Sequence, residues 1–439
     1  MGRRRQHAPL RVYLNSRLVG HLLKEPGGAT SFRYDETWLA WNNAIPVSLS
    51  LPLREDAYRG APVIAVFENL LPDSEMLRRQ IAERMGAEGS DAYSLLAAIG
   101  RDCVGALQFV PEEEELVAGA TVNGDPLDDD AIEKMLTGLA RAPLGLARDD
   151  DFRISLAGAQ EKTALLYDRG QWLRPRGTTP TTHIFKPSIG KLPNGVDLSD
   201  SVENEYYCLK LFAAFGLPVN DAAIETFGNT KALVVTRFDR LWTKDGRLLR
   251  LPQEDCCQAL SFPPSRKYQN EGGPDLVRIL DLLKASDTPE EDRKTVLKAQ
   301  MLFWLIGASD GHAKNFSVSL RPGGSFSLTP LYDVLTVHAN YDSHYINRSQ
   351  MKLAMSVGDN NHYRMDGIRS RHFFQTGKAA GLSKSAVGRA IDEIASTAAG
   401  AMQKLAQELP LHFPENIHDS VGKALNERLR LLTLDHDGF

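Results

Sequence analysis

Cysteine is scarce in this chain of 439 residues, which contains only four. Cys103, Cys208 and the adjacent pair Cys256 and Cys257 show no C-x-x-C spacing. Their number is also far below the cysteine density of a small secreted domain held together by disulfides. This scarcity argues against a disulfide scaffold, and we expect the protein to work in a reducing cytoplasm.

Long apolar runs are missing as well. No run approaches the ~18 residues that a membrane-spanning helix requires. The N-terminus, "MGRRRQHAPLRVYL", is basic, but the apolar segment of a signal peptide does not follow it. We therefore expect no contact with a membrane and interpret the arginine cluster as a solvated tail.

An excess of positive charge is absent too. The net charge is −5 and the isoelectric point is near 6.2, so a contact with nucleic acid would have to come from a local patch or from a partner. Hydrophobic residues make up 42% and charged residues 24% of the chain, which is the balance of a globular protein. Since one hydrophobic core stops growing below this length, we expect two or three packed subdomains.

The first third of the sequence has the pattern of a small α+β unit. The run "RVYLNSRLVGHLL" alternates on both sides of Asn15 and Ser16, which predicts a β-hairpin, and "SFRYDETWLAW" continues the alternation. In "LLPDSEMLRRQIAERMG", Asp73 or Ser74 is the expected N-cap of a helix that ends at Gly86. Acidic stretches rich in glycine and proline then lead to a boundary near residue 151.

From Phe152 the pattern changes to strands around a glycine loop. "FRISLAGAQEKTALLYD" predicts a strand, a tight polar turn around Gly158 and a second strand. Beyond it we expect a strand ending at Lys186, a helix, a strand pair and then mainly helices from about Pro252. The predicted parts of the chain are an N-terminal subdomain, a connecting segment, a β-rich part and a helical lobe, over residues 1–110, 111–151, 152–250 and 251–439.

A crowded polar loop, "SDGHAKNF", directly follows the apolar run "MLFWLIGA". The order of strand, glycine loop, lysine strand, helix, strands, helices, polar loop, hairpin and aspartate parallels the parts of a protein-kinase-like phosphotransferase. In that arrangement Asp310 accepts the proton of the attacking hydroxyl, while Asn315 and Asp333 hold Mg²⁺ on the triphosphate of ATP. One carboxylate and one amide are chemically sufficient, because Mg²⁺ keeps several of its waters.

Each of these features has a simpler alternative when taken alone. The D-x-x-x-x-N spacing of Asp310 and Asn315 occurs about once by chance in a chain this long. Lys186 is either an ordinary strand-end lysine or a phosphate contact whose helix partner is Glu203 or Glu205. Asp333 has the alternative role of a helix N-cap, and His312 that of a loop hydrogen bond.

The glycine loop matches neither of the two common phosphate-binding patterns. It lacks both G-x-x-x-x-G-K-[ST] and G-x-G-x-x-G. Gly158 lies between alanines, however, so backbone N–H groups can approach an anion there, and Lys162 and Thr163 add a cation and a hydroxyl. Phosphate binding and chance resemblance both remain open for this loop.

Several ordered blocks resemble the HipA family of bacterial toxin kinases. They include "RISLAGAQEKTALL", "SVENEYYCLKL", "LPQEDCCQ", "FWLIGASDGHAKNFSV", "LTPLYDV" and "HFPENI", and the similarity spans about residues 10–430. The resemblance implies an α+β, protein-kinase-like, two-lobed fold related to phosphatidylinositol kinases, with a small β-rich N-terminal subdomain and a mainly helical C-terminal lobe. It also implies a serine/threonine protein kinase that uses ATP and Mg²⁺.

The same resemblance implies a biological setting. Family members phosphorylate an aminoacyl-tRNA synthetase, typically the glutamyl enzyme, which stalls translation and produces dormant cells. They are neutralised by HipB, a helix-turn-helix antitoxin dimer, and the pair represses its own operon. The resemblance therefore implies a HipB-like partner and operator DNA bound mainly through that partner.

The resemblance also assigns roles to single positions. Asp310 matches the catalytic base, Asn315 and Asp333 match the magnesium ligands, and Ser155 matches an autophosphorylated serine. The positions that match ATP contacts are Ala157, Gly158, Ala159, Gln160, Glu161, Lys162, Lys186, Thr236, Arg237, Phe238, His312, Ala313, Lys314, Asn315, Tyr332 and Asp333.

Some positions depart from the family pattern. Thr236 to Phe238 match the adenine-contacting hinge. Thr236 replaces an acidic residue there, which leaves ATP binding little affected because hinge contacts are largely made by the backbone. Lys378 fits a phosphate contact with DNA, but Gly381 stands where a second basic residue is expected. Two other functions stay open: a catalytically silent scaffold that stabilises the antitoxin on DNA, and a small-molecule kinase.

Overall fold

The computed structural model describes residues 7–114, 122–148, 150–192 and 195–434. These residues form two compact units, between which the chain passes several times. Unit 1 comprises Met1–Pro187, Glu225–Ser265 and Val318–Phe326, and unit 2 comprises Ser188–Ile224, Arg266–Ser317 and Ser327–Phe439. The predicted solvated tail around Arg3 lies outside the described residues. The fourfold division of the chain stays a prediction.

Unit 1 begins with an antiparallel sheet in the order β4-β3-β2-β1-β6. The predicted hairpin is confirmed, because Asn15 and Ser16 turn the chain with φ angles of 45° and 70°. The predicted continuation of the strand pattern beyond Tyr34 is wrong, since Asp35 instead caps the short helix α1 (Glu36–Leu39). The strands are β1 (Leu10–Leu14), β2 (Arg17–Lys24), β3 (Thr30–Tyr34), β4 (Tyr58–Arg59) and β6 (Leu107–Pro111).

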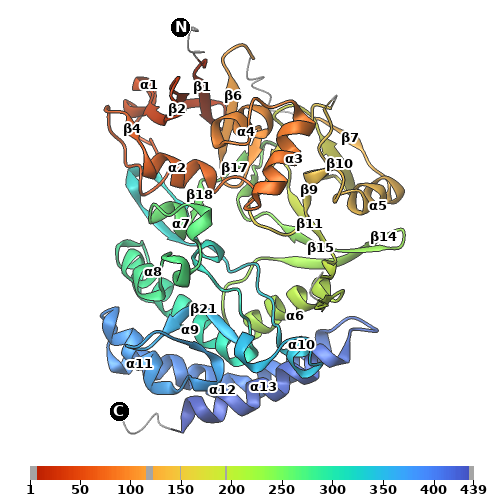
Figure 1. Ribbon diagram of the computed structural model, residues 1–439, viewed down its shortest axis with the longest axis vertical. Helices are drawn as coiled ribbons and strands as arrows, with labels where there is room; N and C mark the ends of the chain where they lie inside the picture. The colour runs from red at the N-terminus through yellow and green to blue at the C-terminus, as the bar shows by residue number, and fades with distance from the viewer. Residues whose placement is uncertain (1–6, 115–121, 149, 193–194, 435–439) are drawn as a thin grey trace. The chain divides into compact units, whose positions relative to one another are not determined.

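Helices α2 and α4 pack on this sheet (Figure 1). Phe32, Phe67 and Phe109 meet between them in tilted and edge-to-face pairs with centroid distances of 5.5 and 5.6 Å. The predicted helix from Ser74 is confirmed as α3, with the Ser74 hydroxyl as its N-cap and Gly86 at its end. The helices of unit 1 are α1 (Glu36–Leu39), α2 (Ala61–Glu68), α3 (Glu75–Met85), α4 (Ala92–Ile99), α5 (Asp129–Thr137) and α7 (Cys256–Ala259).

The second large sheet has the order β14-β15-β11-β9-β10-β7. Its core joins Leu165 and Phe185 of the sheet to Ile132 and Leu136 of α5. The strands are β7 (Gly124–Pro126), β9 (Thr163–Asp168), β10 (Gln171–Pro175), β11 (His183–Pro187), β14 (Ala222–Phe227) and β15 (Thr230–Thr236). The expected strands on both sides of the glycine loop and of Gly228 are therefore confirmed.

Several short strands complete the β structure. The strand before the glycine loop, β8 (Ile154–Ser155), pairs in parallel with β5 (Asp102–Cys103) rather than with β9. The predicted strand pair around Gly323 is confirmed as β19 (Ser317–Leu320) and β20 (Phe326–Leu328). The remaining strands are β12 (Gly190–Lys191), β13 (Asp197–Leu198), β16 (Arg240–Trp242), β17 (Leu248–Arg250), β18 (Gln253–Asp255), β21 (Lys352–Val357) and β22 (His362–Arg364).

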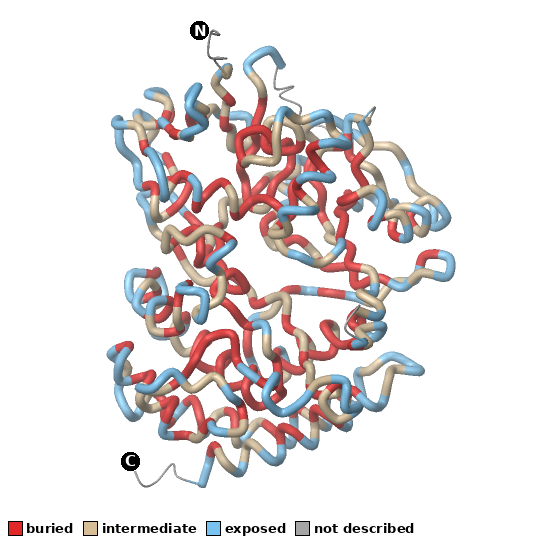
Figure 2. Tube along the Cα trace, in the orientation of Figure 1, coloured by how far each residue is buried: buried red, intermediate tan, exposed pale blue. Residues whose placement is uncertain are grey.

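Unit 2 is mainly helical and is organised around α9 (Pro289–Ile306). Its residues from Thr295 to Ile306 are all buried (Figure 2), because α12 and α13 pack against it. This burial explains why the sequence is apolar on every side of the helix before the polar loop. The other helices of unit 2 are α6 (Ser201–Ala214), α8 (Leu276–Leu282), α10 (His338–Asp342), α11 (Ser370–Ala379), α12 (Lys384–Glu408) and α13 (Glu415–Thr433).

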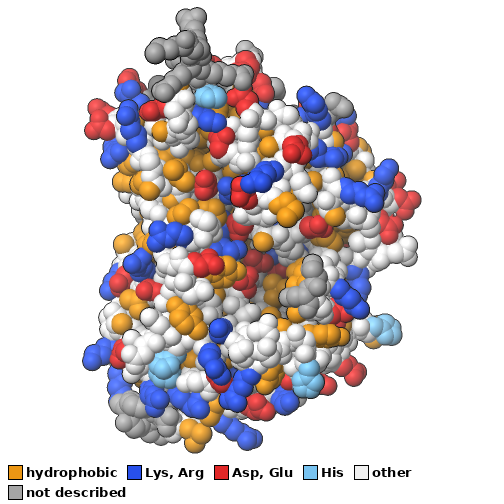
Figure 3. All heavy atoms as spheres, in the orientation of Figure 1, with side chains coloured by type: hydrophobic (Ala, Val, Ile, Leu, Met, Phe, Trp, Pro, Cys, Tyr) orange, Lys and Arg blue, Asp and Glu red, His pale blue; other side chains and the backbone are white. Residues whose placement is uncertain are grey.

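Surface and membrane features can be stated for the described residues. Acidic and basic side chains are interspersed over the face shown in Figure 3. No helix in the described ranges is long and apolar enough to cross a membrane. The four cysteines are buried and free of disulfides. The order of a β-rich first part and a helical second part confirms the predicted α+β class.

Candidate active site

The polar loop after α9 belongs to unit 2 and begins at Gly307, which ends the helix in the left-handed conformation with a φ of 75°. Asp310 is exposed, whereas the residues after it are buried. A Cβ atom on Gly311 would lie 2.4 Å from the ring of Phe303, so only glycine fits there. The loop therefore turns tightly against α9 and presents the Asp310 carboxylate to solvent.

Asn315 joins this loop to the segment that carries Asp333. Its side-chain nitrogen donates hydrogen bonds to the carbonyl oxygens of Asp310 and Asp333, at 3.0 and 3.2 Å. The Tyr332 hydroxyl donates to the Lys314 carbonyl at 3.1 Å and ties the same two segments together. The structure thus brings together Asp310, the predicted base, and Asn315 and Asp333, the predicted magnesium ligands.

Asp333 has an unusual backbone conformation. Its φ of 59° lies in the left-handed region, which residues other than glycine rarely occupy and which often marks functional sites. The alternative role as a helix N-cap is wrong, because the next helix, α10, begins only at His338 and has Val337 as its cap. The strain therefore needs another explanation, and a ligand role supplies one.

The chemistry of these side chains fits a magnesium ion. Because the nitrogen of Asn315 is engaged with two carbonyls, its oxygen Oδ1 is the atom suited to bind a metal. Asp333 adds a carboxylate, so both ligands are the oxygen donors that Mg²⁺ prefers. Within the described ranges no group of three or more His, Cys, Asp or Glu side chains could hold a metal. The magnesium role of Asn315 and Asp333 stays a prediction.

One contact of this loop could not be predicted from the sequence. The hydroxyl of Tyr268 donates a hydrogen bond to Oδ1 of Asp310 at 2.7 Å. Tyr268 and Asp310 are 42 positions apart, and no spacing motif links them. His312, expected to make a nucleotide contact or a loop hydrogen bond, packs edge-on against the ring of Tyr268 with a centroid distance of 4.9 Å.

The glycine loop lies in unit 1 and is held at both ends. Gly158 has a φ of 102°, and its carbonyl accepts a hydrogen bond from the Asp73 N–H at 3.1 Å. Lys162 bridges the loop by donating from Nζ to the Ala157 carbonyl at 2.7 Å. Thr163 does not offer its hydroxyl to an anion as expected, since that hydroxyl is buried and donates to the Leu144 carbonyl at 2.8 Å.

The other residues of this loop are more accessible. Ala159 and Glu161 are exposed, and Gln160 donates from Nε2 to the Pro187 carbonyl at 3.3 Å. The loop is therefore held by the side chains of Lys162 and Gln160 and by the Asp73 N–H. Its role in binding ATP phosphates stays a prediction.

Ser155 lies in β8, just before the glycine loop. Its side chain is completely buried, and its hydroxyl donates to the Leu70 carbonyl at 2.7 Å. This is the backbone hydrogen bond that a simple structural role would give. A phosphate group at this position has no room in the observed packing, so its attachment would require the strand to leave its place.

Lys186 and the expected hinge lie on adjacent strands of unit 1. Lys186 is near the end of β11, and Thr236 ends β15 opposite His183. Glu203 and Glu205, the expected partners of Lys186, are buried on α6 of unit 2. The ion pair between Lys186 and either glutamate stays a prediction.

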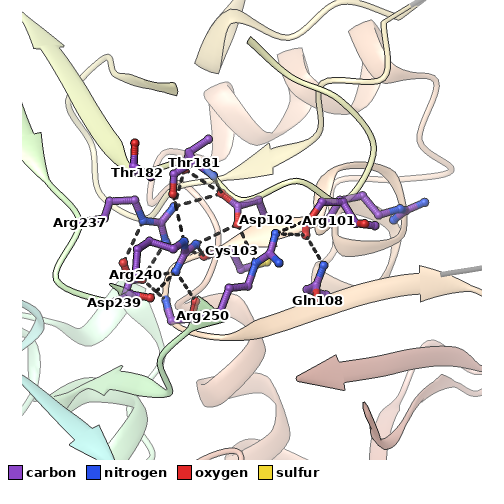
Figure 4. A network of polar contacts seen from close by, with 12 residues as sticks. Arg101, Asp102, Cys103, Gln108, Thr181, Thr182, Arg237, Asp239, Arg240 and Arg250 are labelled. Atoms are coloured by element: carbon purple, nitrogen blue, oxygen red, sulfur yellow. Dashed lines mark hydrogen bonds and ion pairs between the residues drawn. The ribbon is translucent and has the colours of Figure 1, made fainter. Parts of the chain in front are cut away.

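Arg237 is the middle residue of the predicted hinge, and its side chain takes part in a buried ionic network (Figure 4). Its guanidinium contacts Asp102 at 3.2 Å and Asp239 at 2.7 Å, while its backbone N–H donates to the Thr182 carbonyl. Arg240 and Arg250 contact the same Asp102 carboxylate at 2.8 and 2.9 Å. The side chain and the backbone N–H of Arg237 are thus engaged within the protein, and its contact with ATP stays a prediction.

Asp102 and Arg240 of this network stay charged although both are buried. Burial alone would raise the pKa of Asp102, but the guanidinium groups of Arg240, Arg250 and Arg237 outweigh it and hold that pKa well below its usual range. Burial and the neighbouring Arg237 charge lower the pKa of Arg240 to about 10, which still leaves it charged at neutral pH. No local sequence pattern indicates this cluster, because Asp102 and its arginine partners lie more than 130 positions apart.

Comparison with known proteins gives consistent matches along the chain. The HipA N-terminal domain matches residues 10–110, and the HipA-like C-terminal domain matches residues 154–402. Y4mE of Sinorhizobium fredii is 34% identical over 404 residues, which cover 91% of this chain and 92% of that protein. The serine/threonine-protein kinase toxin HipA of Shewanella oneidensis is 28% identical over 364 residues, covering 80% of this chain and 78% of that one.

A solved structure shares the fold. The chain is similar to one in the complex of HipA, HipB and operator DNA from Shewanella oneidensis, with a TM-score of 0.81. The two chains are 23% identical, and the match covers 98% of this chain and 100% of that chain. The resemblance stated from the sequence is therefore confirmed, and this chain is a member of the HipA family.

Proposed function

We propose that this chain is a toxin kinase that transfers the γ-phosphate of ATP to a serine or threonine of a protein. The observation that carries the proposal is the double hydrogen bond of Asn315, which holds the backbones of Asp310 and Asp333 together. Nothing in a purely structural role requires an exposed carboxylate, a strained aspartate and this bridging amide in one place. The relative in Shewanella oneidensis that is named a serine/threonine-protein kinase toxin supports the same activity.

The proposed mechanism assigns each residue a distinct task. Asp310 takes the proton from the acceptor hydroxyl while the hydroxyl oxygen attacks the γ-phosphorus, and the bond to the β–γ bridging oxygen breaks so that ADP leaves. Lys186 and the N–H groups around Gly158 neutralise phosphate charge. Asn315 and Asp333 would hold Mg²⁺, which when bound neutralises charge on the triphosphate.

The acceptor we propose is an aminoacyl-tRNA synthetase, with the glutamyl enzyme as the first candidate. Its modification would stall translation in the cytoplasm and lead to dormancy. This part rests on the family resemblance, and four buried cysteines outside disulfides are compatible with a reducing compartment.

The decisive experiment compares the wild-type chain with Asp310→Asn, using radiolabelled ATP, Mg²⁺ and glutamyl-tRNA synthetase, with casein as a generic protein acceptor. Loss of a general base usually lowers the rate by about 10²- to 10⁴-fold. Binding of ATP should be unchanged, because the amide keeps the size and polarity of the carboxylate. Equal phosphorylation by both proteins would remove Asp310 from the role of base, and no phosphorylation by the wild type would leave the silent-scaffold function in place of the kinase.

We also propose a HipB-like helix-turn-helix dimer as the partner, since the similar Shewanella oneidensis chain was solved with HipB and operator DNA. With a net charge of −5, this chain should add little DNA affinity of its own. Co-purification should yield both proteins in equal number. Tight binding of operator DNA by the isolated chain at physiological salt would contradict this division of roles.

A further inference from the structure

The contact between Tyr268 and Asp310 places a second protein group on the proposed catalytic base. The Tyr268 hydroxyl lies 2.7 Å from Oδ1 of Asp310, the distance of a good O–H···O hydrogen bond. An ionised carboxylate has two oxygens and only accepts hydrogen bonds. A donor fixed on Oδ1 therefore restricts the rotation of the side chain and determines where Oδ2 points.

The ring of Tyr268 makes contacts with two neighbouring side chains. It packs edge-on against His312 with an interplanar angle of 75°, and the ammonium of Lys267 lies 5.3 Å from its centroid. These contacts involve the ring and do not depend on the hydroxyl. The hydroxyl group alone makes the contact with Asp310.

The backbone of Tyr268 is fixed by a tight turn. Its carbonyl accepts hydrogen bonds from the N–H groups of Glu271 and Gly273, at 3.1 and 2.9 Å. A Cβ atom on Gly273 would lie 2.1 Å from the Arg266 carbonyl oxygen, so this close return of the chain requires glycine. The turn thus supports Tyr268 on its C-terminal side.

The next residue, Gln269, anchors the turn to β21. Its side-chain oxygen accepts from the Ser356 N–H at 2.8 Å, and its nitrogen donates to the Ser356 hydroxyl at 2.8 Å. This two-point bond fixes the peptide adjacent to Tyr268 against a buried strand. The position of the phenol is therefore set by the tertiary structure of unit 2 and not by a freely rotating surface loop.

We infer that Tyr268 is a positioning residue for phosphoryl transfer, which acts by orienting the carboxylate of Asp310. The hydroxyl holds Oδ1, and Oδ2 is thereby directed to accept the proton of the protein substrate. This inference rests on the proposed function of Asp310 as the base. Orientation of a catalytic group contributes directly to rate, and small misplacements are costly.

The test is Tyr268→Phe, which removes the hydroxyl and keeps the ring against His312. We expect kcat to fall on the order of 10-fold, while the KM values for ATP and for the protein acceptor stay within about 2-fold. The assay uses the full chain with ATP, Mg²⁺ and the acceptor from the Asp310 experiment. Tyr345→Phe is the matched control, because Tyr345 is 51% exposed and lies on another segment of unit 2.

Two results would overturn the inference. An unchanged kcat would show that Asp310 needs no such support, and a lower KM for the acceptor would show that the Tyr268 hydroxyl blocks the acceptor site. Gln269→Leu, which removes the anchor to Ser356, should lower kcat in the same direction with unchanged KM values. Failure of the proposed function is distinguished separately, because the wild type would then phosphorylate no acceptor, and failure of Asp310 as the base would leave Asp310→Asn as active as the wild type.

Discussion

Arg237 and Asp102 form an ion pair of 3.2 Å, and their side chains are only 1% and 2% exposed. Asp102 belongs to β5, which pairs with the strand before the glycine loop, and Arg237 directly follows β15 and lies in the predicted hinge. One carboxylate within the HipA N-terminal domain thus contacts a residue of the HipA-like C-terminal domain. The two family domains are therefore joined by buried charges inside unit 1.

Asp102→Asn should destabilise the chain strongly. The neutral amide leaves three buried guanidinium groups with one carboxylate, Asp239, and breaking a buried pair typically costs about 3–5 kcal/mol. Urea unfolding at pH 7 measures the loss. The control is Asp245→Asn, because the pair of Asp245 with Arg247 is more than half exposed and such surface pairs add little to stability. Equal midpoints for the two variants would contradict the structural role of the network.

The buried carboxyl group of Glu254 should make the free energy of unfolding depend on pH. Burial raises its pKa from 4.5 to about 8 and outweighs two hydrogen bonds that lower it, one from the Leu49 N–H to Oε1 at 2.7 Å and one from the Ser48 side chain. The folded chain therefore keeps a proton that the unfolded chain releases above its ordinary pKa. This stabilisation is complete below about pH 4.5 and is lost as pH rises to about 8.

We expect the contribution of Glu254 to fall by up to about 1.4 kcal/mol per pH unit in that range. Glu254→Gln mimics the neutral acid and should remove this part of the slope. The free energy of unfolding measured from pH 5 to pH 8 for both proteins gives the comparison. Parallel curves for wild type and variant would show that Glu254 is ionised in the folded chain.

Asp333→Asn should weaken nucleotide binding without a large loss of stability. Asn tolerates the left-handed backbone nearly as well as Asp, whereas Ala at the same φ costs about 1–2 kcal/mol. The Asn variant therefore isolates the loss of a metal ligand, and Asp333→Ala adds the backbone strain. Calorimetric titration with ATP at limiting Mg²⁺ measures the first effect. Unchanged affinity in the Asn variant would remove Asp333 from the proposed metal site.

Phosphorylation of Ser155 should exclude ATP. A phosphoserine adds about −1.5 to −2 charges to a site that is completely buried, so β8 and the glycine loop after it would have to move outward. Mass spectrometry of the overexpressed chain quantifies the phosphopeptide, and ATP binding is measured on the separated fractions. Equal affinity in both fractions would rule out such a switch.

Ser155→Ala tests the folded role of the hydroxyl. Loss of its hydrogen bond to the Leu70 carbonyl should cost about 1 kcal/mol in the free energy of unfolding. Ser385→Ala serves as the control, because Ser385 is exposed at the start of α12. A cost no larger than that of the control would mean that the hydroxyl contributes nothing to packing of the loop.

Much of the fold could be predicted from local signals. The turn at Asn15 and Ser16, the cap at Ser74 and the apolar run of α9 are properties of neighbouring residues, and the structure confirms all three. The helix after Tyr34 was missed, because its single turn is too short to show a helical period. The pairing of β8 with β5 was missed because parallel partners are distant in sequence and leave no turn signal.

The family, the order of the elements and the residues of the polar loop after α9 could be recognised from the sequence, since these depend on residue types at short spacing. Only the tertiary structure decided that Asn315 bridges Asp310 and Asp333, that Asp333 is strained and that Tyr268 reaches Asp310. It also decided that Arg237 turns inward to Asp102. Such contacts join segments tens to more than a hundred positions apart, and their geometry follows from packing, which no local pattern encodes.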